Sequence, residues 1–417
     1  MNFALFLSRR LRLTSTGQKA NTTGVIIAVT GVALAIMVME ITLGVVSGFK
    51  KGITDKLAGF EGQVTVQPAY SYDTEAQDTY ITPDSALRRA VAEAAPGATA
   101  SLKFRLPGLI KTDNDFAGVY FTAHDGTHNF DFERSCIVEG EFPDYTSADN
   151  DLRVVISRPT AQSMRLGTGD KINVCFFIDD AVRMRRFEVA GVYESGFAEY
   201  DTNIAFSSLS ALQSLAGADS LTGTGIELTG ITPDQAAATA ESLQLRLMDD
   251  YRDGKTDRLY PVDNITHTGA VYLNWLSLLD TNVAVIFVLM LCVAALTLVS
   301  SMFILILERI PTIGILRAMG ATRAQVRSTF VFLALKVTGT GMIIGNALGL
   351  GLLLVQKHLQ IVPLDASSYF LHYVPVVISP WAIIGLNVGA LAVAWLILIL
   401  PSAMAARVSP AVTMRFD

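Results

Sequence analysis

The sequence predicts a membrane α-helical protein with four transmembrane helices and an α+β domain, made of two subdomains, on the outer side of the membrane. Four long apolar runs predict the helices, and an acidic stretch of ordinary soluble composition between the first two runs predicts the domain. Only 17% of the 417 residues are charged, whereas soluble domains carry about 25% charged residues. Residues 61–270 hold 17 Lys/Arg and 32 Asp/Glu, and the remainder is basic. An acidic soluble part argues against nucleic acid as a partner.

Each apolar run is long enough to cross a bilayer. The runs cover residues 25–46, 283–307, 330–355 and 381–400. Even the shortest, with about 20 residues at 1.5 Å each, spans about 30 Å, the thickness of the hydrocarbon core. The first run is too long for the core of a signal peptide. With their flanks, the four transmembrane helices are expected at residues 22–49, 278–307, 329–356 and 379–401.

Basic residues in the short connecting segments predict the orientation. The N-terminal tail (1–21) has four basic residues and no acid, and the loop 308–328 has four arginines and one glutamate. The C-terminal tail (402–417) has two arginines and one aspartate. Since Lys/Arg-rich loops stay in the cytoplasm, we expect a multi-pass protein of a bacterial inner membrane with both termini cytoplasmic. The loop 357–378 then lies in the periplasm, and the tail 1–21, apolar between its arginines, is expected to lie along the inner surface.

The outer domain, expected at residues 50–277, contains one short pattern twice. Ile-Thr-Pro-Asp occurs at residues 81–84 and again at 231–234, each time before a helical stretch. Threonine is a good N-cap, proline fits the first helical position, and aspartate is favourable in the first turn. Candidate strands flank each helix, so we expect two βαβ-like units in an α+β core. Residues 112–222 are expected to form a β-rich insert with a hairpin turn at Asp179-Asp180.

We find no persuasive catalytic constellation and expect a non-catalytic subunit without a cofactor. His124 and His128, with Asp125 between them, have the spacing of a metal pair on one helix face. Gly126 instead predicts a surface loop, so we expect no metal. The stretch 254–256, Gly-Lys-Thr, ends like a phosphate loop but lacks the glycine required five positions earlier.

The three cysteines leave one question open. Cys292 lies in an apolar run, and Cys136 and Cys175 lie in the outer domain. An oxidising compartment would permit a disulfide between the latter two. The alternative is two small buried side chains.

The loop after the second apolar run contains the most informative segment, residues 308–322, with the sequence Glu-Arg-Ile-Pro-Thr-Ile-Gly-Ile-Leu-Arg-Ala-Met-Gly-Ala-Thr. Pro311 is expected to start a short helix, Gly320 to end it with a left-handed cap, and Thr322 to cap the next helix. Such a helix is either an amphipathic connector or a coupling helix that docks into a groove on a cytoplasmic partner. Its apolar side is expected to comprise Ile313, Leu316 and Met319.

This segment resembles the FtsX-like family of ABC transporter permeases, and most closely the lipoprotein-releasing (Lol-type) permeases. Residues 45–49, 191–206 and 401–415 resemble further stretches of the same family, in the same order. The resemblance implies a MacB-like periplasmic domain and a separate ATPase subunit dimer that binds ATP and magnesium. Thr312 departs from the family, which usually has an acid there. The residues implied to couple to the ATPase are Glu308, Arg309, Ile313, Gly314, Ile315, Leu316, Arg317, Ala318, Met319 and Gly320.

The family mechanism implied by the resemblance is mechanotransmission, in which closure of the ATPase on ATP moves the coupling helices, the spans and the outer domains. In Lol-type complexes this movement extracts a lipoprotein from the inner membrane and passes it to a periplasmic carrier. A second permease, the same chain or a paralogue, completes the complex. One Lol-type permease grips the carrier with a proline-rich hairpin hook. The hairpin here, residues 177–186, has no proline, so the way a carrier is recruited stays open.

The same resemblance implies a lipid-binding cavity between the first and second spans of the two permeases in the complex. Its implied lining residues are Val45, Val46, Phe49, Trp275, Leu279 and Val283. For each of them, ordinary helix packing or contact with lipid is an equal alternative.

Two intramembrane charges and a row of glycines stand out in the spans. Glu40 lies about 14 Å below the outer end of the first span, and because such a charge usually faces a cavity or a partner, we expect it to line the substrate cavity. Lys336 lies at a different depth and is expected to reach toward the inner surface. Gly341, Gly345 and Gly349 in the third span predict close helix packing.

The leading interpretation is therefore the permease subunit of an ABC complex that extracts lipoproteins. An alternative within the family is export of another hydrophobic substrate. An alternative of a different class is an FtsX-like protein that signals to a cell-wall hydrolase. The large outer domain favours the transporter, because the cell-division type has a much smaller one.

Overall fold

The computed structural model describes residues 20–405, except residues 72–75, 113–114, 179–180, 257 and 309. The chain divides into two compact units. The membrane unit comprises Met1–Lys50, Leu276–Pro363 and Tyr373–Asp417, and the outer unit comprises Lys51–Trp275 and Leu364–His372. The loop between the last two spans therefore contributes nine residues to the outer unit, a feature that its length and composition did not predict.

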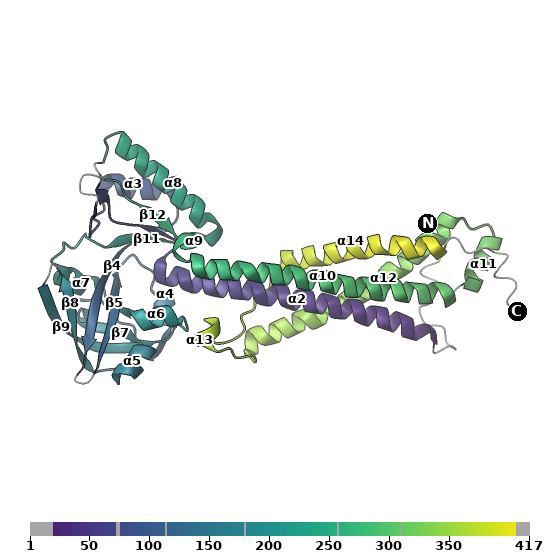
Figure 1. Ribbon diagram of the computed structural model, residues 1–417, viewed down its shortest axis with the longest axis horizontal. Coiled ribbons are helices and arrows are strands. Elements are labelled where there is room, and N and C mark those ends of the chain that lie inside the picture. The colour runs from purple at the N-terminus through teal and green to yellow at the C-terminus, as the bar shows by residue number, and fades with distance from the viewer. Residues whose placement is uncertain are drawn as a thin grey trace. The chain divides into compact units, whose positions relative to one another are not determined.

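Four helices are long and apolar enough to cross a membrane, as predicted. They are α2 (Ala20–Glu61), α10 (Ala270–Glu308), α12 (Arg323–Leu359) and α14 (Pro380–Ala405) (Figure 1). α2 continues 12 residues beyond the expected end at residue 49 and stops before Gly62, which has a φ of +67°. Hydropathy detects only the apolar part of this helix. The polar extension remains helical because it contains no proline and buries Ile53, Leu57 and Phe60 on one face.

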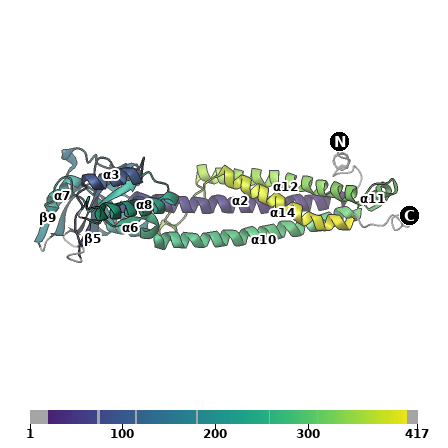
Figure 2. The same ribbon diagram turned by 90° about the horizontal axis from the view of Figure 1, so that it is seen from above.

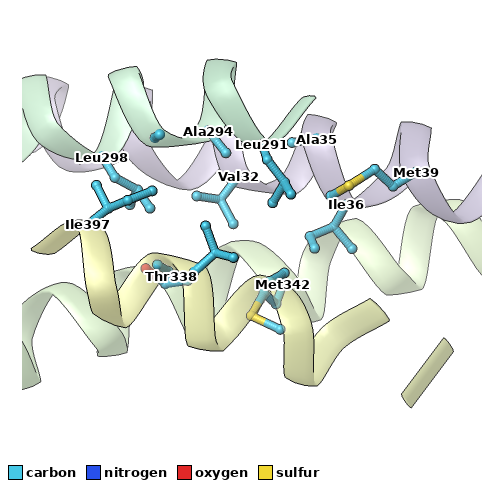
Figure 3. A pocket seen from close by; sticks show the side chains of 14 residues that line it. Val32, Ala35, Ile36, Met39, Leu291, Ala294, Leu298, Thr338, Met342 and Ile397 are labelled. Carbon is cyan, nitrogen blue, oxygen red and sulfur yellow. The ribbon is translucent and has the colours of Figure 1, made fainter. Parts of the chain in front are cut away.

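The membrane unit is a bundle in which all four long helices share an apolar core. The core residues come from α2, α10, α12 and α14, and include Val32, Ile36, Leu298, Met342 and Ala394. They surround a cavity of about 20 Å³ lined almost wholly by aliphatic side chains (Figure 3). A space of this size holds one water-sized molecule at most.

The row of glycines on α12 lies against α2, as the sequence predicted. A Cβ atom added at Gly341 would lie 2.9 Å from the Val29 carbonyl oxygen, and one added at Gly345 would lie 2.6 Å from the Ala33 carbonyl oxygen. Real Cβ atoms do not approach other heavy atoms so closely. The two backbones can pack at this distance only because α12 has no side chains there.

The outer unit is built on one sheet of ten strands among the described residues, in the order β12–β1–β11–β4–β5–β10–β7–β9–β6, with β8 pairing with β4 and β9. A separate pair is formed by β2 (Tyr70–Ser71) and β3 (Ala76–Gln77). The sheet strands are β1 (Val64–Val66), β4 (Thr99–Lys111), β5 (Phe116–His124), β6 (Ile137–Gly140), β7 (Arg153–Ser157), β8 (Lys171–Ile178), β9 (Ala181–Tyr193), β10 (Ile204–Phe206), β11 (Gly225–Thr229) and β12 (Val262–Asn264).

The two repeated units interleave in this sheet. α3 (Ser85–Ala94) connects β1 to β4, and α8 (Pro233–Arg252) connects β11 to β12. β11 lies between β1 and β4, β1 lies between β11 and β12, and neighbouring strands are antiparallel. In each predicted βαβ unit, the two strands joined by the helix are therefore not neighbours, because a strand of the other unit lies between them. α3 and α8 pack on each other and on these strands, around a core that includes Leu87, Leu243 and Leu228 (Figure 1).

The two repeats begin their helices differently. Thr232 occupies the N-cap position of α8 with Pro233 in the first turn, as predicted, but the Thr232 side chain makes no capping hydrogen bond. Thr82 was expected to cap α3, but the cap is Asp84, whose carboxylate accepts a hydrogen bond from the Leu87 N–H at 2.7 Å. A charged side chain two residues later takes the capping role in the first repeat.

The β-rich part has its own apolar core, but its strands belong to the same sheet as the strands of the two repeated units. β4 joins them, because its first half pairs with β11 while its second half pairs with β8. The second core gathers around Phe121, Phe176 and Phe187. The short helices of this part are α4 (Asp131–Ser135), α5 (Arg158–Met164), α6 (Ala198–Asn203) and α7 (Leu209–Ala216), of which α4 and α5 are labelled in Figure 1 and α6 and α7 also in Figure 2. The expected turn at Asp179-Asp180 lies outside the described residues, between the paired ends Ile178 and Ala181.

Candidate functional site

The connector between α10 and α12 contains the short helix α11 (Ile310–Ala318) that the sequence predicted. Gly320 follows it with a φ of +97°, a left-handed conformation that suits glycine. Thr322 then caps α12: its hydroxyl accepts from the Gln325 N–H at 3.3 Å, and its own N–H donates to the Gln325 side chain at 2.9 Å. This reciprocal capping box fixes the entry into α12.

The two faces of α11 differ from the prediction. Ile313 is 1% exposed and packs with Met302, Ile306 and Phe330 at the end of the bundle next to α11. Ile315 is 63% exposed and Met319 is 80% exposed. Ile313 and Met319 therefore do not share one face, and the expected apolar side of Ile313, Leu316 and Met319 is wrong. One apolar position holds α11 to the bundle, and the i,i+4 pair Ile315 and Met319 faces outward.

The other predicted coupling residues lie around this pair. Glu308, Ala318 and Gly320 are exposed, and Gly314 is buried. Arg309, together with the side chains of Leu316 and Arg317, lies outside the described residues.

The predicted lipid-cavity residues are divided between the two units. Val45, Val46 and Phe49 are half-buried on α2, and Leu279 and Val283 are half-buried on α10. Trp275 belongs to the outer unit, where its ring meets Phe370 edge-on.

One contact near this region escaped the sequence analysis. Lys50 of α2 pairs with Asp280 of α10 at 2.5 Å. This ion pair joins two long helices and is exposed, with side-chain exposures of 37% for Lys50 and 63% for Asp280.

Glu40 is buried within the membrane unit. Its carboxylate packs over Gly349 of α12 and lines a cleft with residues of α12, residues 377–379 and the first turn of α14. No residue of α10 lines this cleft. Within this one chain Glu40 thus faces α12 and α14 rather than α10, and its place in a cavity between two permeases stays a prediction. Lys336 is exposed on α12, 13 residues from Gly349, which is about 20 Å along the helix.

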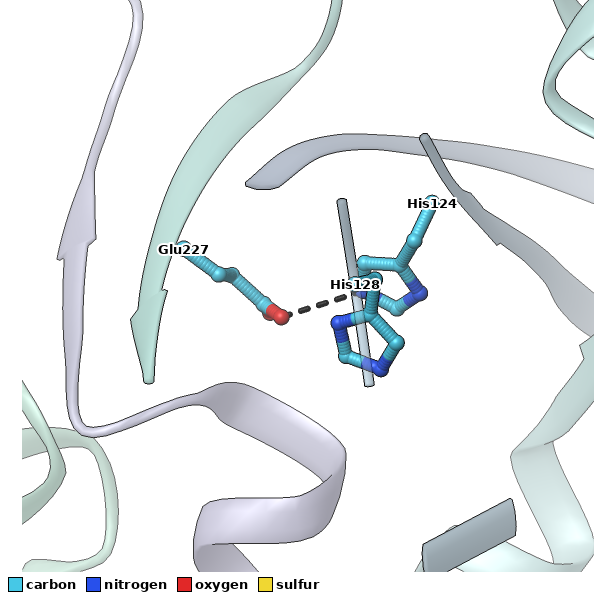
Figure 4. A group of neighbouring side chains, drawn as sticks. All are labelled: His124, His128 and Glu227. Carbon is cyan, nitrogen blue, oxygen red and sulfur yellow. Dashed lines mark hydrogen bonds and ion pairs between the residues drawn. The ribbon is translucent and has the colours of Figure 1, made fainter. Parts of the chain in front are cut away.

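His124 and His128 meet Glu227 in the middle of the outer sheet (Figure 4). His124 Nε2 lies 3.0 Å from a Glu227 oxygen, and His128 Nε2 lies 2.9 Å from a Glu133 oxygen. The two imidazole rings stack with centroids 3.9 Å apart and planes 11° from parallel. The expectation of a surface loop is wrong, because both histidines are at least 91% buried. The loop after β5 folds inward and places His128 against His124 on the sheet.

This cluster fits a buried ion network better than a metal centre. Ligand atoms of His124, His128 and Glu227 all lie within 4.8 Å of one another. However, a metal needs nitrogen lone pairs that converge, and lone pairs in the planes of two nearly parallel rings do not. The Lys103 ammonium also donates to Glu227 and, at 3.2 Å, to Glu61. The absence of a metal therefore stays a prediction with a geometric argument behind it.

The network joins the last residue of α2 to the centre of the sheet. Glu61 accepts from Lys103 and, at 3.3 Å, from Arg105. Burial alone would raise the pKa of Glu227, but Lys103 and His124 outweigh burial and hold that pKa well below its usual range. Burial lowers the pKa of His124. The carboxylate is therefore charged and the imidazole neutral at pH 7.

A second anchor on α2 also escaped the sequence analysis. Lys56 donates to the carbonyl oxygens of Ser195 and, at 2.7 Å, of Phe370. Phe370 has a φ of +61° and stacks on Phe197. The loop between the last two spans is thus fixed to the polar extension of α2 within the outer unit.

The remaining candidate groups show no reactive arrangement in the part of the chain that the structure describes. Cys136 and Cys175 are free thiols on different elements, and burial raises the pKa of Cys136 to about 11. Lys255 pairs with Asp250 at 2.9 Å and with Asp253 at 3.0 Å in the turn after α8. A lysine held by two carboxylates is not available to cradle a phosphate.

Comparison with known families matches both parts of the chain. The MacB-like periplasmic core domain matches residues 25–244, more than half of the chain. The FtsX-like permease C-terminal domain matches residues 284–410.

Three curated relatives are similar to this chain. The lipoprotein-releasing system transmembrane protein LolC of Xylella fastidiosa (strain Temecula1 / ATCC 700964) is 24% identical over 409 residues, which cover 94% of this chain and 93% of that protein. LolC of Neisseria meningitidis serogroup B (strain ATCC BAA-335 / MC58) is 21% identical over 412 residues, 94% of each chain. The lipoprotein-releasing system transmembrane protein LolE of Haemophilus influenzae is 26% identical over 196 residues, 45% of each chain.

Proposed function

Since this chain belongs to the FtsX-like permeases with a MacB-like periplasmic core domain, we propose that it couples ATP hydrolysis by a separate ATPase to the extraction of lipoproteins from the inner membrane. It is an integral membrane protein of the bacterial inner membrane and a permease subunit of an ABC transporter. The cargo follows from full-length similarity to proteins named for lipoprotein release. Both termini and α11 then lie in the cytoplasm, and the outer unit lies in the periplasm.

The exposed pair Ile315 and Met319 is the observation that carries the coupling proposal. These two large apolar side chains are exposed at i,i+4 spacing, Ile315 on α11 and Met319 directly after its last residue. Exposed apolar positions at this spacing are typical of a helix that docks into a groove on a partner. Ile313 on the opposite side is locked among α10 and α12 side chains. A force on α11 would therefore reach the spans directly.

α2 provides the path from the spans to the outer unit. It is one unbroken helix of 42 residues that contributes to both units. Its end is fixed by Glu61 to Lys103 and Arg105, and by Lys56 to the loop at Phe370. Buried, multiply hydrogen-bonded charges hold one geometry more firmly than exposed pairs. A displacement of α2 is thus passed to the sheet rather than lost in side-chain motion.

Depletion of the chain in its native cell tests the function. Mature lipoproteins should accumulate in the inner membrane, and membrane fractionation with immunoblotting measures their distribution. Normal lipoprotein sorting together with unseparated daughter cells would instead support signalling to a cell-wall hydrolase. Normal sorting with another amphiphile retained would support export of a different hydrophobic substrate.

A matched pair of variants tests the coupling helix in the same assay. Met319→Glu should fail to restore lipoprotein sorting although the protein reaches the membrane, because it places a charge in the apolar contact. Leu359→Glu changes a residue that is 67% exposed at the other end of α12, and it should restore sorting. Equal behaviour of the two variants would contradict the role assigned to Met319.

A further inference from the structure

Glu40 is sealed inside the membrane unit without a hydrogen-bond partner. It is 1% exposed, and neither carboxylate oxygen has a hydrogen-bond partner. It lies in the apolar part of α2, where its carboxylate packs over Gly349 of α12. An ionised carboxylate buried in this way is very unfavourable unless a cation accompanies it.

No side chain near Glu40 supplies that cation. The residues that line its cleft come from α2, α12, residues 377–379 and α14, and none of them is charged apart from Glu40 itself. Lys50 is ten residues away on α2 and is paired with Asp280. Lys336 and Lys357 on α12 lie 13 and eight residues from Gly349 and are exposed. The first turn of α14 also lines the cleft, but neither oxygen accepts a hydrogen bond from it, so the helix dipole does not replace a counterion.

The size of the cleft limits what the cation can be. Its volume is about 10 Å³, at the lower limit for one water molecule. Besides Glu40, the side chains with oxygen atoms in its lining are Ser47 and Ser379. A metal cation with a full shell of oxygen ligands does not fit this space. We propose that Glu40 is a proton-binding site, occupied by a single proton while α2, α12 and α14 are packed as in this structure.

This site makes the packing of the first span sensitive to protons. With its proton bound, Glu40 is a neutral acid that can donate one hydrogen bond to a water or a serine hydroxyl in the cleft. A transport step that moves α2 away from α12 would expose the acid, and the proton would pass to water. Reclosure of the helices would then require a proton to be taken up. The inference needs only the four-helix bundle and does not depend on the cargo.

Labelling with dicyclohexylcarbodiimide tests the proposal on the purified full-length protein, with its ATPase where the two co-purify. The reagent adds to carboxylic acids in apolar surroundings: the acid proton moves to a reagent nitrogen, and the carboxylate oxygen bonds to the central carbon. Rearrangement gives a stable N-acylurea that peptide mass spectrometry locates. Glu61 on the same helix is the internal control, because its carboxylate is paired with Lys103 and Arg105.

Glu40 is expected to be labelled and Glu61 not, with the Glu40 adduct falling about tenfold for each pH unit above the point where the site loses its proton. Glu40→Gln should abolish that adduct and change the melting temperature by less than about 2 °C, because a neutral amide replaces a neutral acid. A Glu40 adduct whose yield is the same at about pH 5 and about pH 9 would overturn the proposal. Protection by sodium chloride relative to choline chloride would also overturn it, because the occupant would then be a metal cation. Strong stabilisation by Glu40→Gln would indicate an unpaired ionised carboxylate in the parent protein and would also overturn the proposal.

Discussion

Replacing Gly345 of α12 by alanine should weaken the contact between the first and third spans. The added methyl group would lie 2.6 Å from the Ala33 carbonyl oxygen and 3.0 Å from the Ile36 Cβ atom. Neither atom can move without moving the α2 backbone or its branched side chain. Overpacking of this kind costs about 1–3 kcal/mol, against about 1 kcal/mol gained from the better helix propensity of alanine.

Gly351→Ala provides a matched control on the same helix. A Cβ atom there has no neighbour within 4 Å, so this variant gains the helix propensity without the overlap. The difference in stability between the two variants therefore isolates the cost of the overlap, about 1–3 kcal/mol. At about 2 °C per kcal/mol for a large chain, Gly345→Ala should melt roughly 2–6 °C below Gly351→Ala.

Thermal unfolding of the purified protein, followed by tryptophan fluorescence in one detergent, measures this difference. The assay must compare the two variants with the parent at the same protein and detergent concentrations. Equal melting temperatures, or a lower one for Gly351→Ala, would refute the close approach of α2 and α12.

Two further predictions concern the ion network of the outer unit. Lys103→Met should destabilise the outer unit by about 3–5 kcal/mol, because it leaves Glu227 buried without its ammonium partner. Denaturant unfolding measures this loss. Lys255→Met, which removes an exposed ion pair, is the control and should leave the unfolding free energy unchanged. The outer unit should also lose stability as the pH falls below about 6.5, because burial holds the pKa of His124 below its unfolded value and only the unfolded state takes up that proton. The melting temperature across this pH range checks the trend, and His124→Asn should flatten it; a slope unchanged by the substitution would exclude His124 as its source.

Sequence patterns predicted the features that depend on local chemistry. The four spans follow from apolar length, and the turn around Gly320 and Thr322 follows from capping preferences. The packing role of Gly345 follows from helix periodicity. In each case a few neighbouring residues determine the outcome, so a single sequence is sufficient.

Features that depend on distant contacts were missed or misplaced. His124 and His128 looked like a surface loop, because their burial depends on Glu227, which is about 100 residues away along the chain. The neighbours of Glu40 on α12 and α14 were not predicted, because helix periodicity does not tell which neighbour a face meets. The anchor of Lys56 on Phe370 joins residues that are 314 positions apart, and no local pattern signals it.

The orientation of α11 was misjudged for a similar reason. The apolar residues Ile313, Ile315 and Leu316 lie on α11 and Met319 directly follows it, so periodicity alone does not select the outward face. Contact with Phe330 of α12 selects Ile313 as the inward residue and leaves Ile315 and Met319 outside.

Disulfide cross-linking between α11 and the co-purified ATPase tests the central proposal most directly. The three native cysteines are first replaced by serine, and then Met319→Cys or Ile313→Cys is introduced, with single cysteines placed along the groove of the ATPase. Met319→Cys should cross-link to the ATPase and Ile313→Cys, which is buried, should not. Absence of an ATPase from the purified complex, or reaction of Met319→Cys with a membrane-impermeant maleimide added outside intact inner membranes, would contradict the account.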